Sequence, residues 1–248
     1  MAKKIPPTRY PFSIEQQYAK DIIKLIDMSE KLVMTNYRVS IKSAIERYRE
    51  DVDELSIIQK ILKIIKELVM AIFSPTKLLD IANRFVNNLN KFNEKNIYDQ
   101  SVVMSVQLLQ NNPKINDFVK SSIEQNVKYI KSIEETMLDK VSTVIFEETK
   151  KGTASKVIQE QLMKEFGVSR RKAEFLAVDQ SGSMFGQLTK ERHTSMGVSR
   201  FTWSDSSDSR VRPEHRNYNG KTYDYTNGAN GKFPGSDYRC RCIGMPVF

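Results

Sequence analysis

The sequence predicts a mainly helical α+β protein, in which long N-terminal helices precede a small C-terminal unit of helices and short antiparallel strands. All ten glycines of the 248-residue chain lie at or beyond Gly152, and the residues before it carry apolar side chains at helical spacing. Beyond about residue 200, short aromatic segments alternate with Asn-Gly and Pro-Gly turns. We therefore expect two domains, an N-terminal helical docking domain at residues 1–150 and a C-terminal domain at residues 151–248.

The N-terminal helices are expected to form a bundle or an elongated assembly, because each carries an amphipathic stripe and none contains glycine. A proline-punctuated arm, residues 1–12, precedes them. The predicted helices cover residues 14–33, 39–48, 55–73, 75–109 and 115–148.

Three local features refine this part of the prediction. Residues 55–73 are apolar around most of the helical circumference, so we expect them to form the central, most buried helix. The polar stretch Asn93–Asn96 is expected to interrupt the following helix. Asn111-Asn112-Pro113 is expected to end that helix, since the residue before a proline is driven out of the helical region.

The C-terminal part begins where Lys151-Gly152-Thr153 breaks the helical pattern. A short helix is expected up to Phe166, with Gly167 just beyond its end, where a left-handed conformation costs glycine little. A second helix follows from Arg170, weakened or bent at Ser181-Gly182-Ser183. Phe201-Thr202-Trp203 is then a strand candidate, and Asn219-Gly220 is the strongest hairpin signal in the chain.

Composition and charge narrow the function classes. The net charge of +9 divides into +3 for residues 1–150 and +6 for residues 151–248, so the C-terminal part is the candidate for contact with a polyanion such as DNA. An ordinary basic protein without such a partner is the competing interpretation. No apolar run reaches the roughly 18 residues that a membrane span needs, and residues 1–7 lack the apolar core of a secretory signal.

Histidine and cysteine occur only in the C-terminal part, since residues 1–150 contain neither. His215, Cys240 and Cys242 are candidate ligands of a structural zinc ion, which prefers nitrogen and sulfur ligands. The competing interpretation, which we favour from the sequence, is that both thiols are small buried hydrophobes and His215 is a hydrogen-bonded packing residue. Otherwise no cofactor is expected.

The arginines near His215 also allow two interpretations. Asp208, Arg210 and Arg212 are explained as an ion-paired turn, because the planar guanidinium can clamp carboxylates and carbonyls of neighbouring loops. Contact with DNA phosphates would instead need exposed arginines, and the candidates for it are Arg210, Arg212, Arg216 and Arg241. Trp203, the one tryptophan, is expected to anchor the small C-terminal core.

The order of these residues resembles a known family. The C-terminal part carries a tryptophan, the pattern D-x-R-x-R-x-x-H, a glycine turn, a Pro-Gly pair, Cys-Arg-Cys and a proline. The residues concerned are Trp203, Asp208, Arg210, Arg212, His215, Gly220, Pro234, Gly235, Cys240, Arg241, Cys242 and Pro246. Upstream, Ala173–Gln180 is similar to the helix that precedes this domain in the family. The sequence pattern of that helix is often A-x-x-I-A-R-D-Q, and Val178 stands where arginine is usual. Residues 153–248 thus resemble the Mu F-like minor head protein domain of tailed phages.

The resemblance implies a minor capsid or head morphogenesis protein, located in the virion at the head interior or near the portal, and in the host cytoplasm during assembly. It implies several copies per virion, contact with the portal or major capsid protein, and contact with packaged double-stranded DNA during packaging and ejection. No enzyme activity is expected, because phosphate-cradling glycine loops, nucleophile elbows and H-E-x-x-H are absent from the sequence. The alternative is a nucleic-acid-binding or nuclease/toxin-like protein, with His215 and His193 as an acid/base pair.

Overall fold

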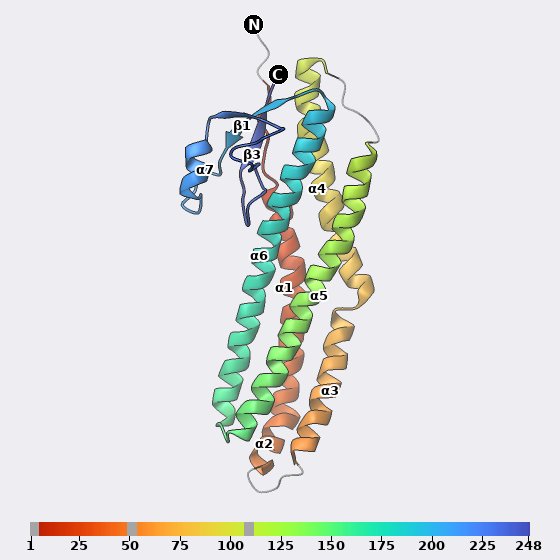
Figure 1. The fold of residues 1–248 in the computed structure, drawn as a ribbon. Helices are drawn as coiled ribbons and strands as arrows, with labels where there is room; N and C mark the ends of the chain where they lie inside the picture. Colours follow the sequence, from red (N-terminus) through yellow and green to blue (C-terminus); the bar gives the residue numbers. More distant parts are fainter. Residues whose placement is uncertain (1–4, 49–53, 107–111) are drawn as a thin grey trace. The chain divides into compact units, whose positions relative to one another are not determined.

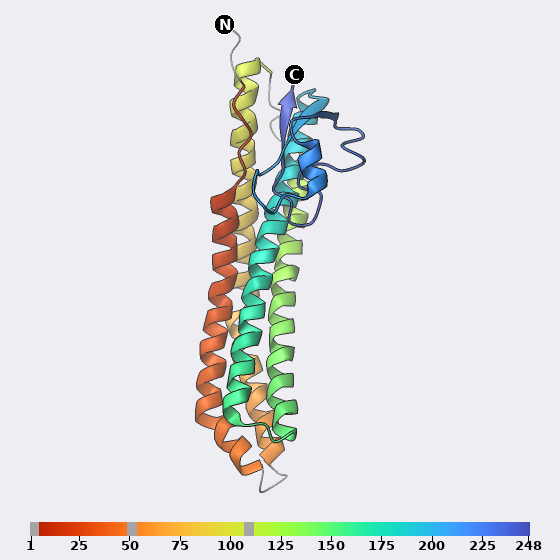
Figure 2. The same cartoon turned by 90° about the vertical axis from the view of Figure 1, so that its left-hand side faces the viewer.

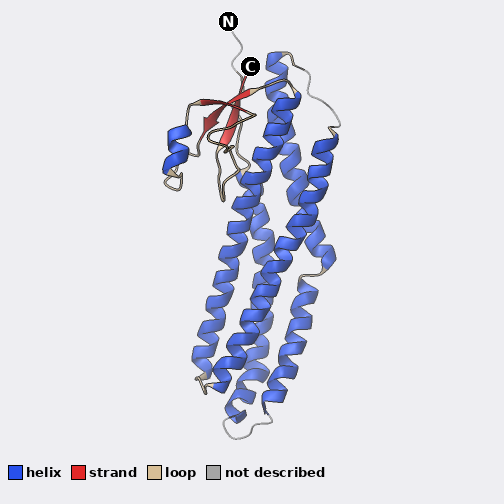
Figure 3. Ribbon diagram, viewed as in Figure 1, coloured by secondary structure: helices blue, strands red, loops and turns tan. Residues whose placement is uncertain are grey.

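Long helices dominate the computed structural model, which describes residues 5–48, 54–106 and 112–248 (Figure 1). The three strands lie in the C-terminal part of the chain (Figure 3), and the predicted fold class is confirmed. The bounds are α1 Phe12–Asn36, the π-helical segment η1 Tyr37–Ile41, α2 Lys42–Tyr48, α3 Glu54–Ile72, α4 Pro75–Met104, α5 Pro113–Lys150, α6 Ser155–Ser195, β1 Arg200–Ser204, α7 Pro213–Tyr218, β2 Thr222–Asp224 and β3 Ile243–Val247.

Packing groups the chain into two compact units, each assembled from segments that are distant in sequence. The first unit comprises Met1–Tyr18, Ala82–Gln125 and Phe175–Phe248, and the second comprises Ala19–Ile81 and Asn126–Glu174. The helices α1, α4, α5 and α6 each contribute residues to both units. The expected division into residues 1–150 and 151–248 follows the sequence rather than this packing, and it stays a prediction.

Within the second unit, α3 corrects the expectation that residues 55–73 form the most buried helix. Ile65 and Val69 are buried, but Ile57, Ile64 and Leu68 on the adjoining face are 38%, 53% and 43% exposed. The apolar arc of α3 is therefore wider than the face that packs against described neighbours. Periodicity reports how apolar a helix is, whereas burial also depends on how many neighbours cover it.

In the first unit, the polar stretch at Asn93–Asn96 does not interrupt α4. The Asn93 side chain is buried, accepts a 2.7 Å hydrogen bond from Arg192 Nη1 and donates one of 2.7 Å to Thr189 Oγ1. Asn96 Oδ1 accepts the Arg9 backbone N–H at 3.0 Å. These asparagines form a satisfied polar face of the helix, which the sequence pattern alone cannot distinguish from a loop signal.

The two predicted C-terminal helices are one helix, α6, which runs from Ser155 to Ser195. Gly167 is not a helix terminus, and its φ is not positive. The Ser169 hydroxyl donates to the Glu165 carbonyl at 3.1 Å within this continuous helix. A glycine in a helix interior costs about 1 kcal/mol relative to alanine, which the tertiary contacts of a 41-residue helix can offset.

The N-terminal arm is extended up to α1 and runs beside α4 (Figure 2). Gln100 Nε2 donates to the Pro6 carbonyl at 3.1 Å, and Thr8 Oγ1 donates to the Gly244 carbonyl at 3.1 Å. The predicted break at Asn111-Asn112-Pro113 falls partly on residues 107–111, which lie outside the described residues; α5 begins at Pro113. None of the described helices is long and apolar enough to cross a membrane.

The sheet has the order β2-β1-β3 and is antiparallel throughout. The strand predicted at Phe201–Trp203 is the central strand β1, and Pro246 in the edge strand β3 pairs with Phe201. Asn219-Gly220 does not form the predicted hairpin. With Asn219 at φ −55° and ψ 131°, Gly220 at φ +75° and a 3.0 Å bond from Lys221 N–H to the Tyr218 carbonyl, it is a type II turn that joins α7 to β2.

Candidate functional site

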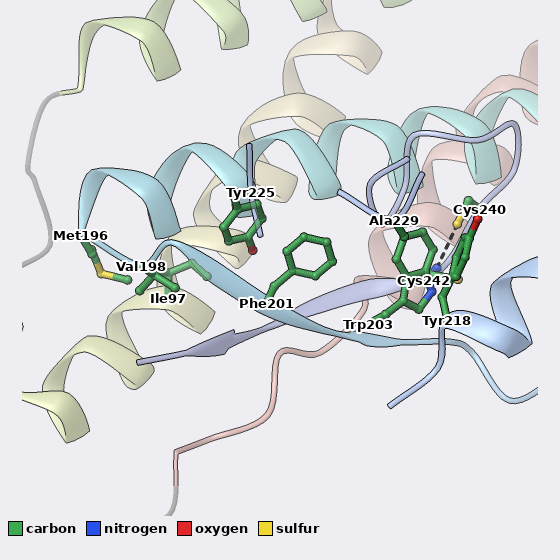
Figure 4. Packing of buried hydrophobic residues seen from close by; sticks show 10 residues of the cluster. All are labelled: Ile97, Met196, Val198, Phe201, Trp203, Tyr218, Tyr225, Ala229, Cys240 and Cys242. Carbon is green, nitrogen blue, oxygen red and sulfur yellow. Dashed lines mark hydrogen bonds between the residues drawn. The ribbon is translucent and has the colours of Figure 1, made fainter. Parts of the chain in front are cut away.

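Trp203 is the centre of the small C-terminal core. It points from β1 into a cluster of buried residues and is 1% exposed (Figure 4). Its ring centroid lies 5.0 Å from that of Tyr218 and 5.2 Å from that of His215, both on α7. The expected role of Trp203 as an anchor agrees with this packing, because a large aromatic side chain buries much apolar area in a small core.

Two chain segments bring His215, Cys240 and Cys242 together. Pro213 starts α7, and His215, two residues later, is buried against Trp203 of β1. Cys240 and Cys242 precede β3, are both buried and are not joined in a disulfide. The Nδ1 atom of His215 lies 3.5 Å from Cys240 Sγ and 3.5 Å from Cys242 Sγ. The three candidate ligands of the sequence therefore converge in the structure.

The opposite ring nitrogen of His215 is held by a carboxylate. His215 Nε2 lies 2.9 Å from Asp237 Oδ2, and Lys232 Nζ donates to the same oxygen at 3.0 Å and to Glu214 Oε2 at 2.8 Å. Burial raises the pKa of Asp237, but the hydrogen bonds from Lys232 and His215 outweigh it and hold the pKa below its ordinary value. The carboxylate is then an acceptor only, so Nε2 carries the proton and the Nδ1 lone pair faces the two sulfurs.

The electrostatics of the thiols are unequal. The pKa of Cys240 is lowered to about 6, chiefly by its hydrogen bond with Cys242 and also by the backbone N–H groups of Cys242 and Gly235. The Cys242 N–H lies 3.4 Å from Cys240 Sγ, the dashed contact in Figure 4. The pKa of Cys242 is raised by the hydrogen bond to Cys240 and by burial, while Trp203 acts in the opposite direction. Of the two thiols, Cys240 is therefore the one whose surroundings favour the thiolate.

A cavity of about 20 Å³ opens beside this cluster, lined by His215, both cysteines and the neighbouring arginines. That volume has room for about one water molecule. The indole N–H of Trp203 is buried, has no hydrogen bond of good geometry among the described residues, and acts as a donor toward the Cys242 thiol. The cluster therefore combines converging ligand atoms, a small adjoining space and an indole donor beside the sulfurs.

The arginines of the motif have different partners. Asp208 accepts the Arg210 backbone N–H at 2.8 Å and its guanidinium at 2.7 Å, as expected for an ion-paired turn. Arg212 Nη2 donates to the Tyr238 carbonyl at 2.6 Å. Arg216 is exposed and reaches the Asp208 carbonyl at 3.3 Å. Of the candidate phosphate contacts, Arg210 and Arg216 are thus the exposed ones, while contact with DNA stays a prediction.

Arg241, between the two cysteines, is committed to a carboxylate near the start of α1. Its Nη2 and Nε donate to the two oxygens of Glu15 at 2.6 and 3.0 Å, and Tyr10 donates to Glu15 Oε2 at 2.8 Å. Both charged side chains are largely buried. This two-bond geometry suits guanidinium and carboxylate and leaves Arg241 little freedom to grip a phosphate.

Two glycines of α6 allow the loop before Cys240 to lie directly on the helix. A side chain at Gly182 would collide with the Cys240 carbonyl, and one at Gly186 would collide with the Pro234 carbonyl. Gly235 has φ +85° and lies against Gly182, so the predicted Pro-Gly turn is needed at this point. Ser181-Gly182-Ser183 is therefore a packing surface rather than a weak point.

His193 does not join His215. It is fully buried, with Nδ1 2.6 Å from the Tyr225 hydroxyl and Nε2 3.1 Å from Gln100 Oε1. Burial lowers its pKa to about 3. Each histidine thus has its own set of partners, and neither imidazole is open to solvent. This arrangement does not provide the solvent-accessible acid/base pair that the nuclease alternative needs.

Three of the motif residues, Trp203, Cys240 and Cys242, lie in one buried cluster. Residues 139–245 match the family model of Phage Mu protein F like protein. The match confirms the resemblance indicated by the motifs. It also extends N-terminal of residue 153 into α5. The Mu F-like region thus includes the end of α5, all of α6 and most of the residues that follow α6.

A protein of Haemophilus influenzae named "Uncharacterized protein" is 32% identical to this chain over 173 residues. The aligned part covers 68% of this chain but 39% of that protein, so this chain spans well under two thirds of the length of its relative. No solved structure matches the chain.

The sequence missed the residues that support the site from outside the motif. Asp237 orients His215, and Glu15 holds Arg241 from the other end of the chain. Acidic residues are frequent in this sequence, and no spacing rule relates a carboxylate to a partner 22 or 226 residues away. Asp179 accepts the Arg239 N–H at 2.9 Å, and its place in the A-x-x-I-A-R-D-Q pattern was the one available signal.

Proposed function

We propose that this chain is a structural protein of phage head morphogenesis, a minor capsid protein present in several copies in the head interior or near the portal, and in the host cytoplasm during assembly. The match of residues 139–245 to Phage Mu protein F like protein carries the proposal. That family indicates head morphogenesis. Docking to the portal or major capsid protein is the finer part of the proposal.

The use of the motif residues supports a structural role. Asp179, Arg212 and Arg241 bind a backbone N–H, a backbone carbonyl and a buried carboxylate, respectively. Each contact fixes the loop that leads into β3. Side chains that already bind other parts of the protein are not free to bind a substrate or to act on it. The absence of enzyme activity nevertheless stays a prediction.

The exposed face of α3 supports docking through the N-terminal helices. Ile57, Ile64 and Leu68 recur at the spacing of a single helical stripe and are exposed. An exposed stripe of large apolar side chains is typical of a surface that a partner covers. For a protein whose C-terminal part is Mu F-like, we take that partner to be the portal or major capsid protein.

The docking proposal is tested with a phage in which the gene is deleted and supplied from a plasmid. We expect quantitative mass spectrometry to detect the wild-type chain in purified virions or procapsids. The variant Ile64→Glu/Leu68→Glu should be incorporated at least tenfold less, while Gln59→Glu, which adds charge at an exposed position off the stripe, should be incorporated normally.

Two results would contradict this proposal. Absence of the wild-type chain from both virions and procapsids would overturn the assignment to head morphogenesis. Normal incorporation of the stripe variant would overturn docking through α3. Far-ultraviolet circular dichroism of each variant separates loss of docking from loss of folding.

Contact with packaged double-stranded DNA is a second candidate function, favoured by the exposure of Arg210 and Arg216 in a chain of net charge +9. Fluorescence anisotropy with labelled duplex DNA should show affinity that falls steeply with salt. Arg210→Ala/Arg216→Ala should reduce the slope of log K against log salt by about 1–2. Arg38→Ala, which removes an exposed arginine from the N-terminal part, is the control. Salt-insensitive binding, or an unchanged slope, would contradict DNA contact through these arginines.

A nuclease role is tested by incubating the purified chain with RNA and with DNA. Because His215 and His193 are both buried, we expect no cleavage above background. Cleavage that disappears in His215→Ala would contradict the structural assignment and support the nuclease alternative. Cleavage that survives in His215→Ala would exclude this histidine as its source.

A further inference from the structure

We propose that His215, Cys240 and Cys242 bind a zinc ion through Nδ1 and the two Sγ atoms, as a structural centre of the C-terminal core. This inference is independent of the role in head morphogenesis. It rests on the distances between the ligand atoms, on the orientation of the imidazole and on the space beside the cluster.

The spacing of the ligand atoms fits a tetrahedral ion. Zinc bonds of about 2.0–2.1 Å to nitrogen and about 2.3 Å to sulfur, at a tetrahedral angle, separate the nitrogen and sulfur atoms by about 3.6 Å. His215 Nδ1 lies 3.5 Å from each of the two sulfurs. All three ligand atoms lie within 4.8 Å of one another. A single ion can therefore reach all three without a rearrangement of the backbone.

A metal ion would use the ligand atoms of this cluster more fully than hydrogen bonds do. With its proton on Nε2, His215 offers a single lone pair on Nδ1, but two thiols approach it at the same distance. One lone pair can accept one S–H donor well, so the Cys242 S–H group has only the weak sulfur acceptor of Cys240. A cation bound by two thiolates and the imidazole removes both thiol protons and uses the lone pair fully.

The surroundings of His215 have the form of a second coordination shell. Asp237 binds Nε2 and is itself held by Lys232, so the imidazole is fixed in the tautomer and orientation that direct Nδ1 toward the sulfurs. A carboxylate on the far nitrogen is the usual outer partner of a metal-bound histidine. The thiolates also have donors nearby, since the Cys242 N–H faces Cys240 Sγ and the Trp203 indole N–H has no other partner among the described residues.

All three ligand residues line the cavity of about 20 Å³, which is where we place the fourth coordination position. That space accommodates about one water molecule, so the fourth ligand would be water rather than a protein side chain. Two thiolates and one imidazole select a soft or borderline ion such as zinc over magnesium or calcium, which prefer oxygen ligands.

The ion would connect two segments of the chain that belong to different secondary-structure elements. His215 lies on the six-residue helix α7, while both cysteines lie in the loop before the edge strand β3. A small unit built from a three-stranded sheet and turns has a limited apolar core, and a structural metal compensates for such a limit. We therefore expect the metal to stabilise the folded C-terminal unit rather than to act on a substrate.

Cobalt binding tests the site with a spectroscopic signal. The full-length chain, purified without a histidine tag in the presence of a reductant and stripped of metal, is titrated with Co²⁺. We expect about one cobalt per chain, with a thiolate-to-cobalt charge-transfer band and d–d bands of tetrahedral intensity, and displacement by Zn²⁺. Because the chain has two cysteines, any thiolate band must come from Cys240 or Cys242.

Matched variants assign the ligands. Cys240→Ser and Cys242→Ser should each lower the zinc affinity at least 100-fold. Asp237→Asn should lower it about 10- to 100-fold, as loss of an outer partner does, without removing the charge-transfer band. His193→Gln, which alters the other histidine of the chain, should bind with wild-type stoichiometry.

A measurement on the wild-type chain alone covers the case in which the variants do not fold. Bound zinc should protect both thiols from alkylation, and a chelator should restore their reactivity. The proposal is overturned if the folded, reduced wild-type chain binds neither Zn²⁺ nor Co²⁺ at micromolar concentrations. It is also overturned if binding persists unchanged in both serine variants, or if zinc leaves the alkylation rates unaltered.

Discussion

At the scale of single residues, His193 shows how a polar side chain is accommodated in a core. Its Nε2–H donates to Gln100 Oε1, which can only accept, so Nδ1 accepts from the Tyr225 hydroxyl. Gln100 Nε2 continues the chain of hydrogen bonds by donating to Thr8 Oγ1 at 2.9 Å. The neutral imidazole thus links α6 to α4, to the C-terminal loops and, through Gln100, to the N-terminal arm.

His193 should make stability depend on pH. Burial lowers its pKa to about 3 in the folded chain, while the unfolded chain titrates near 6.5. Below about pH 6.5 the unfolded state takes up a proton that the folded state refuses, so the stabilisation present at neutral pH is lost as the pH falls toward 3. His193→Gln should lower the free energy of unfolding at pH 7 by about 1–3 kcal/mol, through the lost acceptor for Tyr225.

The measurement is urea unfolding of the wild type and of His193→Gln at pH 7.0, 5.5 and 4.5. We expect the difference between the two proteins to shrink, and then reverse, as the pH falls. A difference that is constant over this range would contradict the assignment of a neutral, buried His193. The comparison between proteins removes the contributions of all other titrating groups, which both chains share.

The sequence identified residues whose chemical type is rare and missed those whose type is common. His215, Cys240 and Cys242 stood out because the chain has two histidines and two cysteines. Asp237 and Glu15 could not be chosen among thirty acidic residues, because their selection depends on a fold that brings distant segments together. For the same reason, the separation of His193 from His215 into different networks was not visible from the sequence.

At the scale of elements, α6 contains glycines with opposite consequences. Gly167 and Gly182 both have helical conformations, yet a Cβ at Gly167 would meet only Arg171 Nη1 at 3.8 Å, while one at Gly182 would collide with the Cys240 carbonyl. Gly167→Ala should therefore stabilise the chain by about 0.5–1 kcal/mol. Gly182→Ala should destabilise it by about 1–3 kcal/mol, despite the better helix propensity of alanine.

Thermal unfolding followed by circular dichroism distinguishes these substitutions, since the two changes should shift the midpoint in opposite directions. A stabilising Gly182→Ala would show that the loop before Cys240 does not lie on α6 as the structure has it. A destabilising Gly167→Ala would show instead that the helix needs glycine there for a reason that the structure does not contain.

Adjacent isoleucines of α3 provide a second comparison within one element. Ile65 is 1% exposed and Ile64 is 53% exposed, although both belong to the apolar arc of the helix. Ile65→Ala should lower the free energy of unfolding by about 2–4 kcal/mol through loss of buried area and formation of a cavity. Ile64→Ala should change it by less than about 0.5 kcal/mol. Equal losses in urea unfolding would contradict the exposure of the α3 stripe.

Element types were more predictable than their limits and their burial. The start of α4 at Pro75 and the aromatic strand β1 lie where the sequence predicts them. Gly167 and Asn93 were misread as breaks, because local signals for a helix end were outweighed by packing and by buried hydrogen bonds. The burial of α3 was overestimated because the hydrophobic pattern does not reveal which apolar side chains other segments cover.

At the scale of the whole molecule, the compact units are made of interleaved segments, which no compositional boundary predicts. The glycine-free part of the sequence supplies residues to both units, and so does α6. Within the first unit, the arm before α1 contacts the end of the chain, where Thr8 binds the Gly244 carbonyl and Glu15 binds Arg241. These contacts between distant segments form only in the folded protein, and the periodicity of apolar residues does not predict them.

The pair Glu15–Arg241 should be the strongest single tie between the two ends of the chain, because it is bidentate and largely buried. Arg241→Met and Glu15→Gln should each lower the free energy of unfolding by about 3–5 kcal/mol, since each leaves a buried charge unpaired. The double variant should lower it by far less than the sum of the two single losses, because neither charge then remains. Urea unfolding of the wild type, the two single variants and the double variant measures this coupling. As a control, Arg210→Ala, which breaks the exposed pair with Asp208, should lower the free energy of unfolding by less than about 1 kcal/mol. Additive losses from the two single substitutions would show that the ends of the chain are not joined through this pair.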